Sequence, residues 1–273
     1  MKLIKFLALS PITSWFFELG YKFFYRFRFE KELIPIQNRQ IKNKKMEEKL
    51  QILFKDKTVL NGPFKGMVYP NFYSYGSSLY SKFLGTYENE LNEVWERFRE
   101  KQFDKIIDVG CAEGYYAVGL SKLFPKTKVE AYDIIEEARN ACKMLSDHNK
   151  AANIEVKEFF GPNDIEKLNE KSRNLIIVDC EGFEYELFTK KNVAHLRNST
   201  LIIELHDLVN QRISPHIKNL FKNSHKIELV LSKNALEKID GIKLIEELSI
   251  EEKLFGFNER TSLMQWMILT PLK

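Results

Sequence analysis

The segment from Lys105 to Ile134 constrains the fold more than any other part of the chain. It contains a short apolar strand that ends in Asp108-Val109, and a glycine-spaced turn, Gly110 to Gly114, follows at once. Tyr115 to Leu123 has the length and pattern of a helix, and Val129 to Tyr132 has those of a second strand. Strand, turn, helix and strand in this order predict a βαβ unit, whose two strands lie parallel in one sheet.

The turn after the first strand and the acid after the second predict a nucleoside-binding site. Ligands of open parallel sheets bind beyond the carboxyl ends of the strands. Gly110 and Gly114 have no Cβ atom, so a ligand can approach the backbone there, and free N–H groups of the following helix point into the same space. Asp133 follows Gly114 by 133 − 114 = 19 residues, close to the spacing of about 20 expected of a carboxylate that binds ribose. The alternative is a tight turn that only packing requires.

The glycine spacing indicates which nucleoside to expect. The turn reads G-x-x-x-G rather than G-x-G-x-x-G, and the chain has no G-x-x-x-x-G-K-[ST], so a pyrophosphate or triphosphate ligand is not predicted. D-x-G-x-x-x-G with a later acid resembles the S-adenosylmethionine (SAM) site of class I methyltransferases. This resemblance implies SAM as the cofactor. The cofactor contacts that it implies are Asp108, Gly110, Cys111, Glu113, Gly114, Asp133 and Ile134.

The rest of the chain predicts five more strands, with helices between them. The predicted strands are 154–160, 174–178, 201–205, 226–231 and 264–270, and the predicted helices include 135–150 and 215–221. We therefore expect an α/β protein with a Rossmann-like, doubly wound, seven-stranded sheet of the class I methyltransferase type, with the last strand antiparallel. In that arrangement the loop after the third strand lies beside the adenine, which makes Asn163 a candidate cofactor contact.

Charged side chains gather after the fourth and fifth predicted strands. Asp179 and Glu181 follow the fourth strand, and Glu204 and His206 end the fifth. These strand ends lie next to the first strand's turn in a doubly wound sheet, so we expect the side chains beside the cofactor. Alternation along a strand puts Asp179 and Glu181 on one face, and Glu204 and His206 on one face. A carboxylate here can also steady the positive sulfonium or the amino group of SAM, which makes Asp179 a cofactor candidate too.

The same cluster predicts the chemistry. A hydroxyl that accepts a methyl group must lose its proton, and His206 is the first candidate for the base, with Glu181 second and Asp179 completing the catalytic set. The alternative for His206 is a strand-end histidine that is simply hydrogen-bonded. No metal ion is part of the predicted site, although Mg²⁺ held by Asp179, Glu181 and a third oxygen is an alternative. The candidate substrate contacts are Tyr87, Glu88 and Glu204, and we expect Tyr87 and Glu88 in the first turn of a helix that continues to Phe98.

Two short segments carry a more specific resemblance. Asp179-Cys180-Glu181-Gly182-Phe183-Glu184 is similar to the "D-[VC]-E-G-x-E" segment of the FkbM family of SAM-dependent methyltransferases. Leu201-Ile202-Ile203-Glu204-Leu205-His206 is similar to that family's "[IV]-x-E-[IL]-H" segment. The resemblance covers roughly 105–207 and implies O-methylation of hydroxyls on sugars or other small natural products. The turn differs, because Cys111-Ala112-Glu113 stands where many members have Ala-Asn-x.

The first 60 residues differ in kind from the rest. We predict a helical extension and linker at 1–60 and a methyltransferase domain at 61–273. Aromatic side chains and cations mix in residues 1–32, whose longest uncharged run, 6–17, is too short for a spanning helix of about 20 apolar residues. Such a segment either packs on its own domain or a second copy, or lies in a membrane interface. The predicted parts of the domain are a core at 103–233, an insertion at about 234–256 and a final strand at 264–270.

Composition bounds the partners and the compartment. The 273 residues are 44% hydrophobic and 29% charged, which is ordinary for a globular protein with a sizeable core. A net charge of +4 is too small to indicate nucleic acid, so we expect a small-molecule or glycan acceptor. Three cysteines without a C-x-x-C pair are typical of a reducing compartment. We therefore expect a cytoplasmic location, with peripheral membrane contact through 1–32 as an alternative.

The sequence thus predicts a SAM-dependent O-methyltransferase acting on a sugar, a glycan or a small natural product. One alternative is a nicotinamide-dependent oxidoreductase on the same βαβ site, which would require a third close glycine and a pyrophosphate-binding turn. The other is a catalytically inactive, membrane-associated binding module. The acids and the glycine that speak against this module are Asp108, Gly110, Asp133, Asp179 and Glu181.

Overall fold

The computed structural model describes residues 31, 34–260 and 262–272, and it divides the chain into two compact units, Met1–Ile52 and Leu53–Lys273. Each unit is described by itself. Helix α3 (Ile34–Leu53) lies almost wholly in the first unit, within the stretch 1–60 that the sequence predicts to be a helical extension and linker. The predicted membrane contact of residues 1–32 falls almost wholly outside the described residues. Within the described part of the chain, no helix has the length and apolar character that crossing a bilayer requires.

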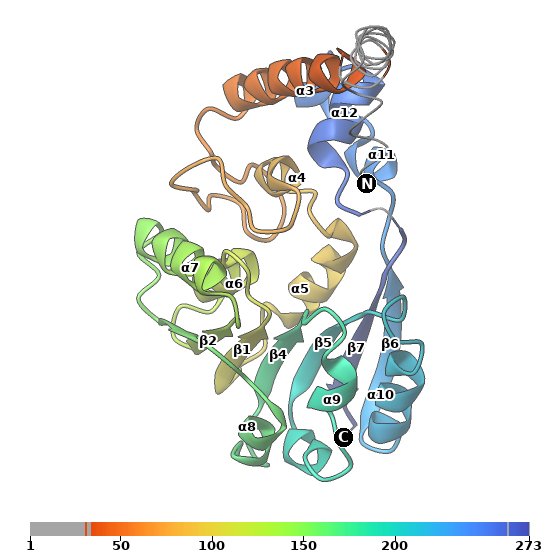
Figure 1. The fold of residues 1–273 in the computed structure, drawn as a ribbon. Helices are drawn as coiled ribbons and strands as arrows, with labels where there is room; N and C mark the ends of the chain where they lie inside the picture. Colours follow the sequence, from red (N-terminus) through yellow and green to blue (C-terminus); the bar gives the residue numbers. More distant parts are fainter. Residues whose placement is uncertain (1–30, 32–33, 261, 273) are drawn as a thin grey trace, which may run out of the picture. The chain divides into compact units, whose positions relative to one another are not determined.

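The second unit contains seven strands and the helices that connect them (Figure 1). The strands are β1 (Lys105–Val109), β2 (Lys128–Tyr132), β3 (Ile154–Lys157), β4 (Asn174–Val178), β5 (Thr200–Leu205), β6 (His225–Leu231) and β7 (Gln265–Pro271). The α-helices are α4 (Leu79–Leu84), α5 (Asn92–Phe98), α6 (Tyr115–Leu123), α7 (Glu136–His148), α8 (Pro162–Glu166), α9 (Glu184–Leu187), α10 (Ile213–Phe221), α11 (Ala235–Ile239) and α12 (Ile250–Phe257). The 3-10 helices are η2 (Asn89–Leu91), η3 (Val193–Leu196) and η4 (Lys243–Ile245).

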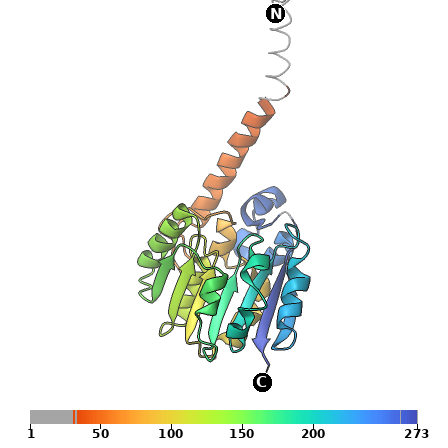
Figure 2. The same ribbon diagram turned by 60° about the horizontal axis from the view of Figure 1, so that its bottom comes forward.

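The strands form one mixed sheet in the order β3-β2-β1-β4-β5-β7-β6 (Figure 2). Strands β1 to β5 are parallel, and β7 runs antiparallel to both β5 and β6. The order reverses at β1, so β1 and β4 flank the topological switch point where such sheets bind ligands. The predicted fold class, a Rossmann-like sheet of the class I methyltransferase type with an antiparallel last strand, is confirmed.

Both faces of the sheet are covered. On one face, alternate strand residues such as Ile107, Ile176 and Met267 pack with Leu187 of α9 and Ile217 of α10 in one apolar cluster. Burying a side chain of this size contributes about 1.5–3 kcal/mol. Successive strand residues point to opposite faces, so the neighbour of Met267, Trp266, points to the other face.

Helices α5 and α6 cover that second face. The Trp266 ring lies 6.3 Å from the ring of Tyr116 on α6, and Tyr116 lies 5.5 Å from the ring of Trp95 on α5. These buried aromatic rings extend the core to helices that flank β1, the strand that carries the predicted cofactor turn.

The stretch predicted as an insertion folds into α11, η4 and α12. Ser78, next to α4, donates a hydrogen bond of 2.9 Å to the carbonyl of Gly256 on α12. The buried ammonium of Lys238 on α11 lies 2.7 Å from Glu90 and 2.6 Å from Glu259. This stretch is therefore bound to the segment that precedes β1, beside the carboxyl end of the sheet.

Two predicted boundaries are wrong in the structure. The third strand ends at Lys157 instead of Phe160, because Gly161-Pro162 already begins α8. Tyr87 and Glu88 were expected in the first turn of a helix that continues to Phe98, but α4 ends at Leu84 where Gly85 takes a left-handed conformation (φ 81°). Both residues therefore lie in the connection between α4 and η2, and Glu88 is itself left-handed (φ 48°).

One charge cluster on the sheet gives a prediction on stability. The side chain of Glu130 on β2 is 7% exposed and receives hydrogen bonds from Lys105, Lys157 and Tyr132. Burial alone raises the pKa of this carboxyl, but the two lysines and the tyrosine outweigh it and lower the pKa to about 2. Because the pKa of the folded form is depressed, the stabilisation is complete above the unfolded value of about 4.5 and is lost as the pH falls toward 2.

We expect Glu130→Gln to lower the free energy of unfolding by about 2 kcal/mol at pH 7 and by less than half of that, roughly, at pH 3. Urea unfolding at pH 7, 5 and 3 measures it. Glu155→Gln is the control, since Glu155 is half-exposed on the neighbouring strand beside Lys157 and should change stability much less than Glu130→Gln does. An equal effect of Glu130→Gln at pH 7 and pH 3 would contradict the prediction.

Candidate active site

The turn between β1 and α6 has two left-handed glycines, Gly110 (φ +86°) and Gly114 (φ +95°). A Cβ atom on Gly110 would lie 1.6 Å from the backbone oxygen of Asp179, and one on Gly114 would lie 2.7 Å from the Sγ atom of Cys142. Packing within the chain therefore requires both glycines. Contact of a cofactor with the turn stays a prediction.

Asp133 lies directly beyond β2, beside this turn. Its Oδ2 atom accepts a hydrogen bond of 3.0 Å from the Ala112 amide in the turn, and Oδ1 accepts one of 2.9 Å from the Ile135 amide. Each carboxylate oxygen has a second lone pair, so two acceptor positions remain. The two amides fix the orientation of the carboxylate at the carboxyl end of the parallel strands, as the sequence predicts for a ribose-binding acid.

Asp108 is buried under the turn. Its carboxyl is 1% exposed, and its Oδ2 atom has no hydrogen-bond partner among the described residues. Burial, reinforced by the charge of Asp179, raises the pKa of Asp108 to about 8. The Asp108 carboxyl therefore keeps its proton to a higher pH than a free aspartate does.

Glu113 of the turn binds the segment before β1. Its buried carboxylate is paired with the ammonium of Lys82, and both side chains are 2% exposed. The same carboxylate accepts hydrogen bonds from the Tyr69 hydroxyl (3.2 Å), the Ser74 hydroxyl (3.1 Å) and the Tyr75 amide (3.1 Å). Glu113 thus holds the loop of residues 69–75 against the turn, a role that the sequence gave no reason to expect.

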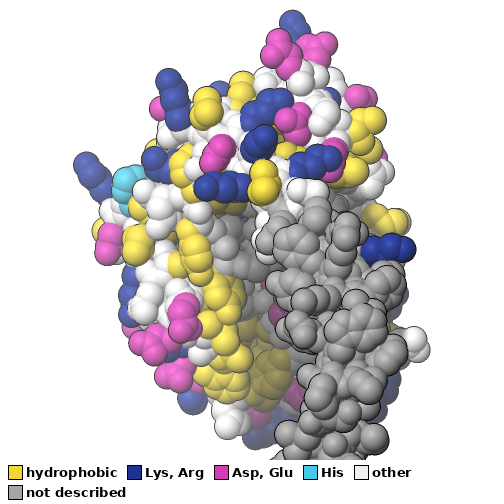
Figure 3. All heavy atoms as spheres, turned by 45° about the horizontal axis from the view of Figure 1, so that its top comes forward, with side chains coloured by type: hydrophobic (Ala, Val, Ile, Leu, Met, Phe, Trp, Pro, Cys, Tyr) yellow, Lys and Arg dark blue, Asp and Glu magenta, His cyan; other side chains and the backbone are white. Residues whose placement is uncertain are grey.

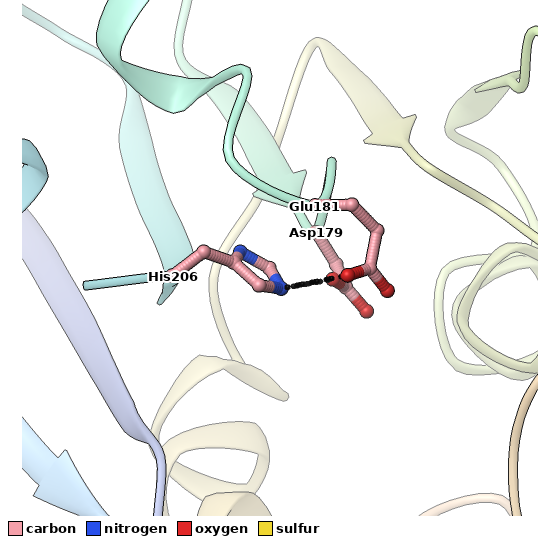
Figure 4. A group of neighbouring side chains, drawn as sticks. All are labelled: Asp179, Glu181 and His206. Carbon is pink, nitrogen blue, oxygen red and sulfur yellow. Dashed lines mark ion pairs between the residues drawn. The ribbon is translucent and has the colours of Figure 1, made fainter. Parts of the chain in front are cut away.

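The residues after β4 and β5 converge on His206. The ring atom Nε2 lies 3.5 Å from Asp179 Oδ1 and 3.6 Å from Glu181 Oε2 (Figure 4). It also lies 3.8 Å from Glu204 Oε2. These side chains therefore lie together, as alternation predicts for Glu204 and His206, but alternation along a strand does not explain the position of Glu181. β4 ends at Val178, and Glu181 lies beyond it in a left-handed conformation (φ 55°) that directs its carboxylate toward the ring.

Glu184 is the partner of His206 that sequence reasoning missed. Its fully buried carboxylate lies 2.7 Å from His206 Nδ1. Burial lowers the pKa of the imidazole, but the hydrogen bond and charge of Glu184, with the charges of Asp179 and Glu181, outweigh burial and raise that pKa. Burial also raises the pKa of Asp179. A signal existed in the sequence, since Glu184 is the last acid of the segment Asp179 to Glu184.

Arg260 is the second missed residue. It lies between α12 and β7, and its guanidinium pairs with Glu88 and with Glu204 on β5. Glu88, 1% exposed, also accepts a hydrogen bond from the hydroxyl of Tyr116. Two of the predicted substrate contacts, Glu88 and Glu204, are therefore joined by one arginine. No motif surrounds Arg260, so nothing in the sequence pointed to it.

Four predicted site residues remain, and they differ in burial. Tyr87 is half-buried, with its ring 5.2 Å from the ring of Tyr115 on α6. Cys111 is buried in the turn, whereas the Ile134 side chain is 68% exposed. Asn163 is exposed on α8, and no contact of its side chain with the other candidates is found among the described residues. Their roles stay predictions.

Comparison with known proteins gives similarities of structure only. No family model matches the chain, the FkbM family included, and no curated protein matches it. Precorrin-6y C5,15-methyltransferase from Geobacter metallireducens is 13% identical (TM-score 0.44) over 66% of this chain and 87% of that one. The bifunctional kinase-methyltransferase WbdD is 16% identical (TM-score 0.44) over 67% of this chain and 38% of that one. A ribosomal protein L11 methylase from Lactobacillus delbrueckii is 18% identical (TM-score 0.41) over 63% of this chain and 72% of that one.

Proposed function

We propose that the chain is a SAM-dependent methyltransferase that transfers a methyl group to a hydroxyl of a sugar, a glycan or a small natural product. The observation that carries this proposal is the Asp133 carboxylate, held by backbone amides at the carboxyl end of β2 beside the β1 turn. The cluster around His206 lies beyond β4 and β5, at the same edge of the sheet.

The residues at the switch point fit the parts of SAM. Asp133 has two free acceptor positions for the ribose hydroxyls, and Asp108, whose pKa is raised, can donate a hydrogen bond when it is protonated. Asp179 follows β4, the neighbour of β1, where its carboxylate can face a positive amino or sulfonium group. SAM supplies an electrophilic methyl group on a sulfonium sulfur.

The cluster around His206 supports proton removal from the acceptor. Glu184 accepts a hydrogen bond from Nδ1, so the other ring nitrogen is free to take the hydroxyl proton. The hydroxyl oxygen then bonds to the methyl carbon, and the carbon–sulfur bond breaks with its electron pair left on sulfur. Holding the two reacting atoms in line supplies up to about 7–11 kcal/mol of the barrier reduction in favourable cases.

Two features favour a polyhydroxyl acceptor. Arg260, which pairs with Glu204, also lines a cavity of about 290 Å³ with the polar residues Ser232, Asn234 and Asn258. Ala235 and Leu263 line it as well, so the cavity suits a molecule that has both hydroxyl groups and apolar C–H faces, as sugars do. The two segments that resemble the FkbM family also meet, because Glu184 of one binds His206 of the other. Charges of both signs are mixed on the surface drawn in Figure 3, and a nucleic-acid acceptor is not part of the proposal.

The test is calorimetric titration of the full chain with SAM, S-adenosylhomocysteine and NAD⁺. We expect micromolar binding of the first two ligands, and at least about tenfold weaker binding in Asp133→Ala, because a lost charged hydrogen bond costs about 1.5–3 kcal/mol. Asp147→Ala is the matched control, since Asp147 is an exposed acid near the end of α7. Tight binding of NAD⁺ with none of SAM would refute the proposal, as would unchanged SAM affinity in Asp133→Ala.

A further inference from the structure

We propose that Asp179, Glu181 and His206 form a binding site for one divalent transition-metal ion. One ligand atom from each residue lies within 4.8 Å of the other two, and Nε2 of His206 lies 3.5 Å from Asp179 and 3.6 Å from Glu181. Neighbouring ligands of one ion, each about 2.0–2.3 Å from it, are separated by roughly 3.0–3.5 Å. The three side chains in Figure 4 therefore need only small movements to hold an ion together.

The hydrogen bond of His206 fixes the tautomer that a metal requires. Nδ1 lies 2.7 Å from Glu184, whose carboxylate can only accept, so Nδ1 carries the hydrogen. The neutral ring then presents the lone pair of Nε2 to the oxygens of Asp179 and Glu181. Metal-binding histidines commonly donate their second nitrogen to a carboxylate in this way, which orients the ring and strengthens the ligand.

The atoms that face the site lack other partners. The His206 side chain is 6% exposed, and no hydrogen bond to its Nε2 atom is found among the described residues. Asp179 Oδ1 is buried and likewise has no hydrogen-bond donor there. If Nε2 carried a proton, the nearest oxygens of Asp179 and Glu181 would lie 3.5 and 3.6 Å from the nitrogen. These N···O distances are longer than the 2.7–3.2 Å of an N–H···O hydrogen bond. An ion bound to all three would satisfy the nitrogen and both oxygens.

The donor set and the neighbouring charge select the kind of ion. A ring nitrogen with two carboxylate oxygens suits Mn²⁺, Fe²⁺ or Zn²⁺ better than Mg²⁺, which prefers oxygen alone. Glu204 is already paired with Arg260, which leaves Asp179 and Glu181 to balance the charge of a divalent ion. Glu181 is 87% exposed, so the site opens on one side to solvent or to an acceptor.

The ion would change how the acceptor is activated, a consequence that rests on the proposed function. With Nε2 bound to the ion, His206 is a ligand and no longer the base. An acceptor hydroxyl that reaches the ion has a lowered pKa and gives up its proton to water near neutral pH. Binding of the ion itself requires neither SAM nor an acceptor.

The experiment uses the full chain, freed of metal with a chelator, and Mn²⁺ as the probe without SAM. We expect calorimetry and the loss of the free-Mn²⁺ EPR signal to show one ion per chain at micromolar concentration. Binding should weaken at least about tenfold in Asp179→Asn and in Glu181→Gln. The control is Glu186→Gln, an exposed acid on α9, which should bind like the unaltered chain.

Pulsed EPR of the Mn²⁺-loaded chain supplies a readout that does not depend on any variant folding. We expect one ¹⁴N coupling from the His206 ring. No binding up to millimolar Mn²⁺, or binding without that coupling, would overturn the inference. Failure of the SAM titration with Mn²⁺ bound as expected would refute the methyltransferase proposal and leave the ion site standing.

Discussion

Replacing Lys82 by methionine is expected to lower the free energy of unfolding by about 3–5 kcal/mol. The ammonium of Lys82 is paired with Glu113, and both side chains are 2% exposed. It also lies 4.7 Å from the centre of the Tyr87 ring and 2.6 Å from the Ser77 hydroxyl. Removing the cation leaves the Glu113 charge buried with hydrogen bonds but no counter-charge, and breaking a buried pair in this way is strongly destabilising. Urea unfolding followed by circular dichroism measures the loss.

Two further variants test the cause. Glu113→Gln combined with Lys82→Met removes both charges, so the double variant should be more stable than Lys82→Met alone. Lys191→Met is the control, because Lys191 is 79% exposed and pairs with Glu166 at 2.6 Å; it should cost less than about 0.5 kcal/mol. If the double variant were no more stable than Lys82→Met, loss of packing rather than an unpaired charge would explain the effect.

Replacing Gly110 by alanine is expected to cost about 4 kcal/mol or more, or to prevent folding. The new Cβ atom would lie 1.6 Å from the backbone oxygen of Asp179, and this oxygen cannot move without shifting β4 against β1. Gly66→Ala is the matched control, since Gly66 has nearly the same φ (+84° against +86°) and nothing within 4 Å of its Cβ position. It should cost only about 1 kcal/mol, the strain of a left-handed alanine. Equal losses in the two variants would show that the backbone angle, and not the approach of β4, makes glycine necessary.

Local patterns in the sequence were sufficient to predict the fold. The strand of 174–178 was predicted with its observed bounds, because it is uniformly apolar and stops at Asp179. The helix of 115–123 was predicted equally well, since Gly114 precedes it and Pro125 follows it closely. Such signals depend on neighbouring residues only, and they suffice for a sheet whose parallel strands alternate with helices.

The interactions between distant segments could not be predicted in this way. The pairs of Lys82 with Glu113 and of Arg260 with Glu88 join parts of the chain far apart in sequence, and each partner alone resembles an ordinary surface charge. Burial of the first pair depends on how the segment before β1 packs on the turn after β1, and burial of the second depends on how that segment meets the segment before β7. The position of Glu181 likewise follows from a left-handed backbone angle that strand periodicity does not reveal.

The position of β7 has a consequence for synthesis on the ribosome. β7 is the last of the seven strands of this sheet to be made, yet it lies inside the sheet, between β5 and β6. Until residues 265–271 leave the exit tunnel, β5 keeps an unpaired edge, and an apolar unpaired edge can pair with another chain. Arg260, which joins Glu88 to Glu204, emerges at the same late stage. We therefore expect the β5 edge of a nascent chain to be exposed to aggregation until 265–271 have emerged, and the link between Glu88 and Glu204 forms at the same stage.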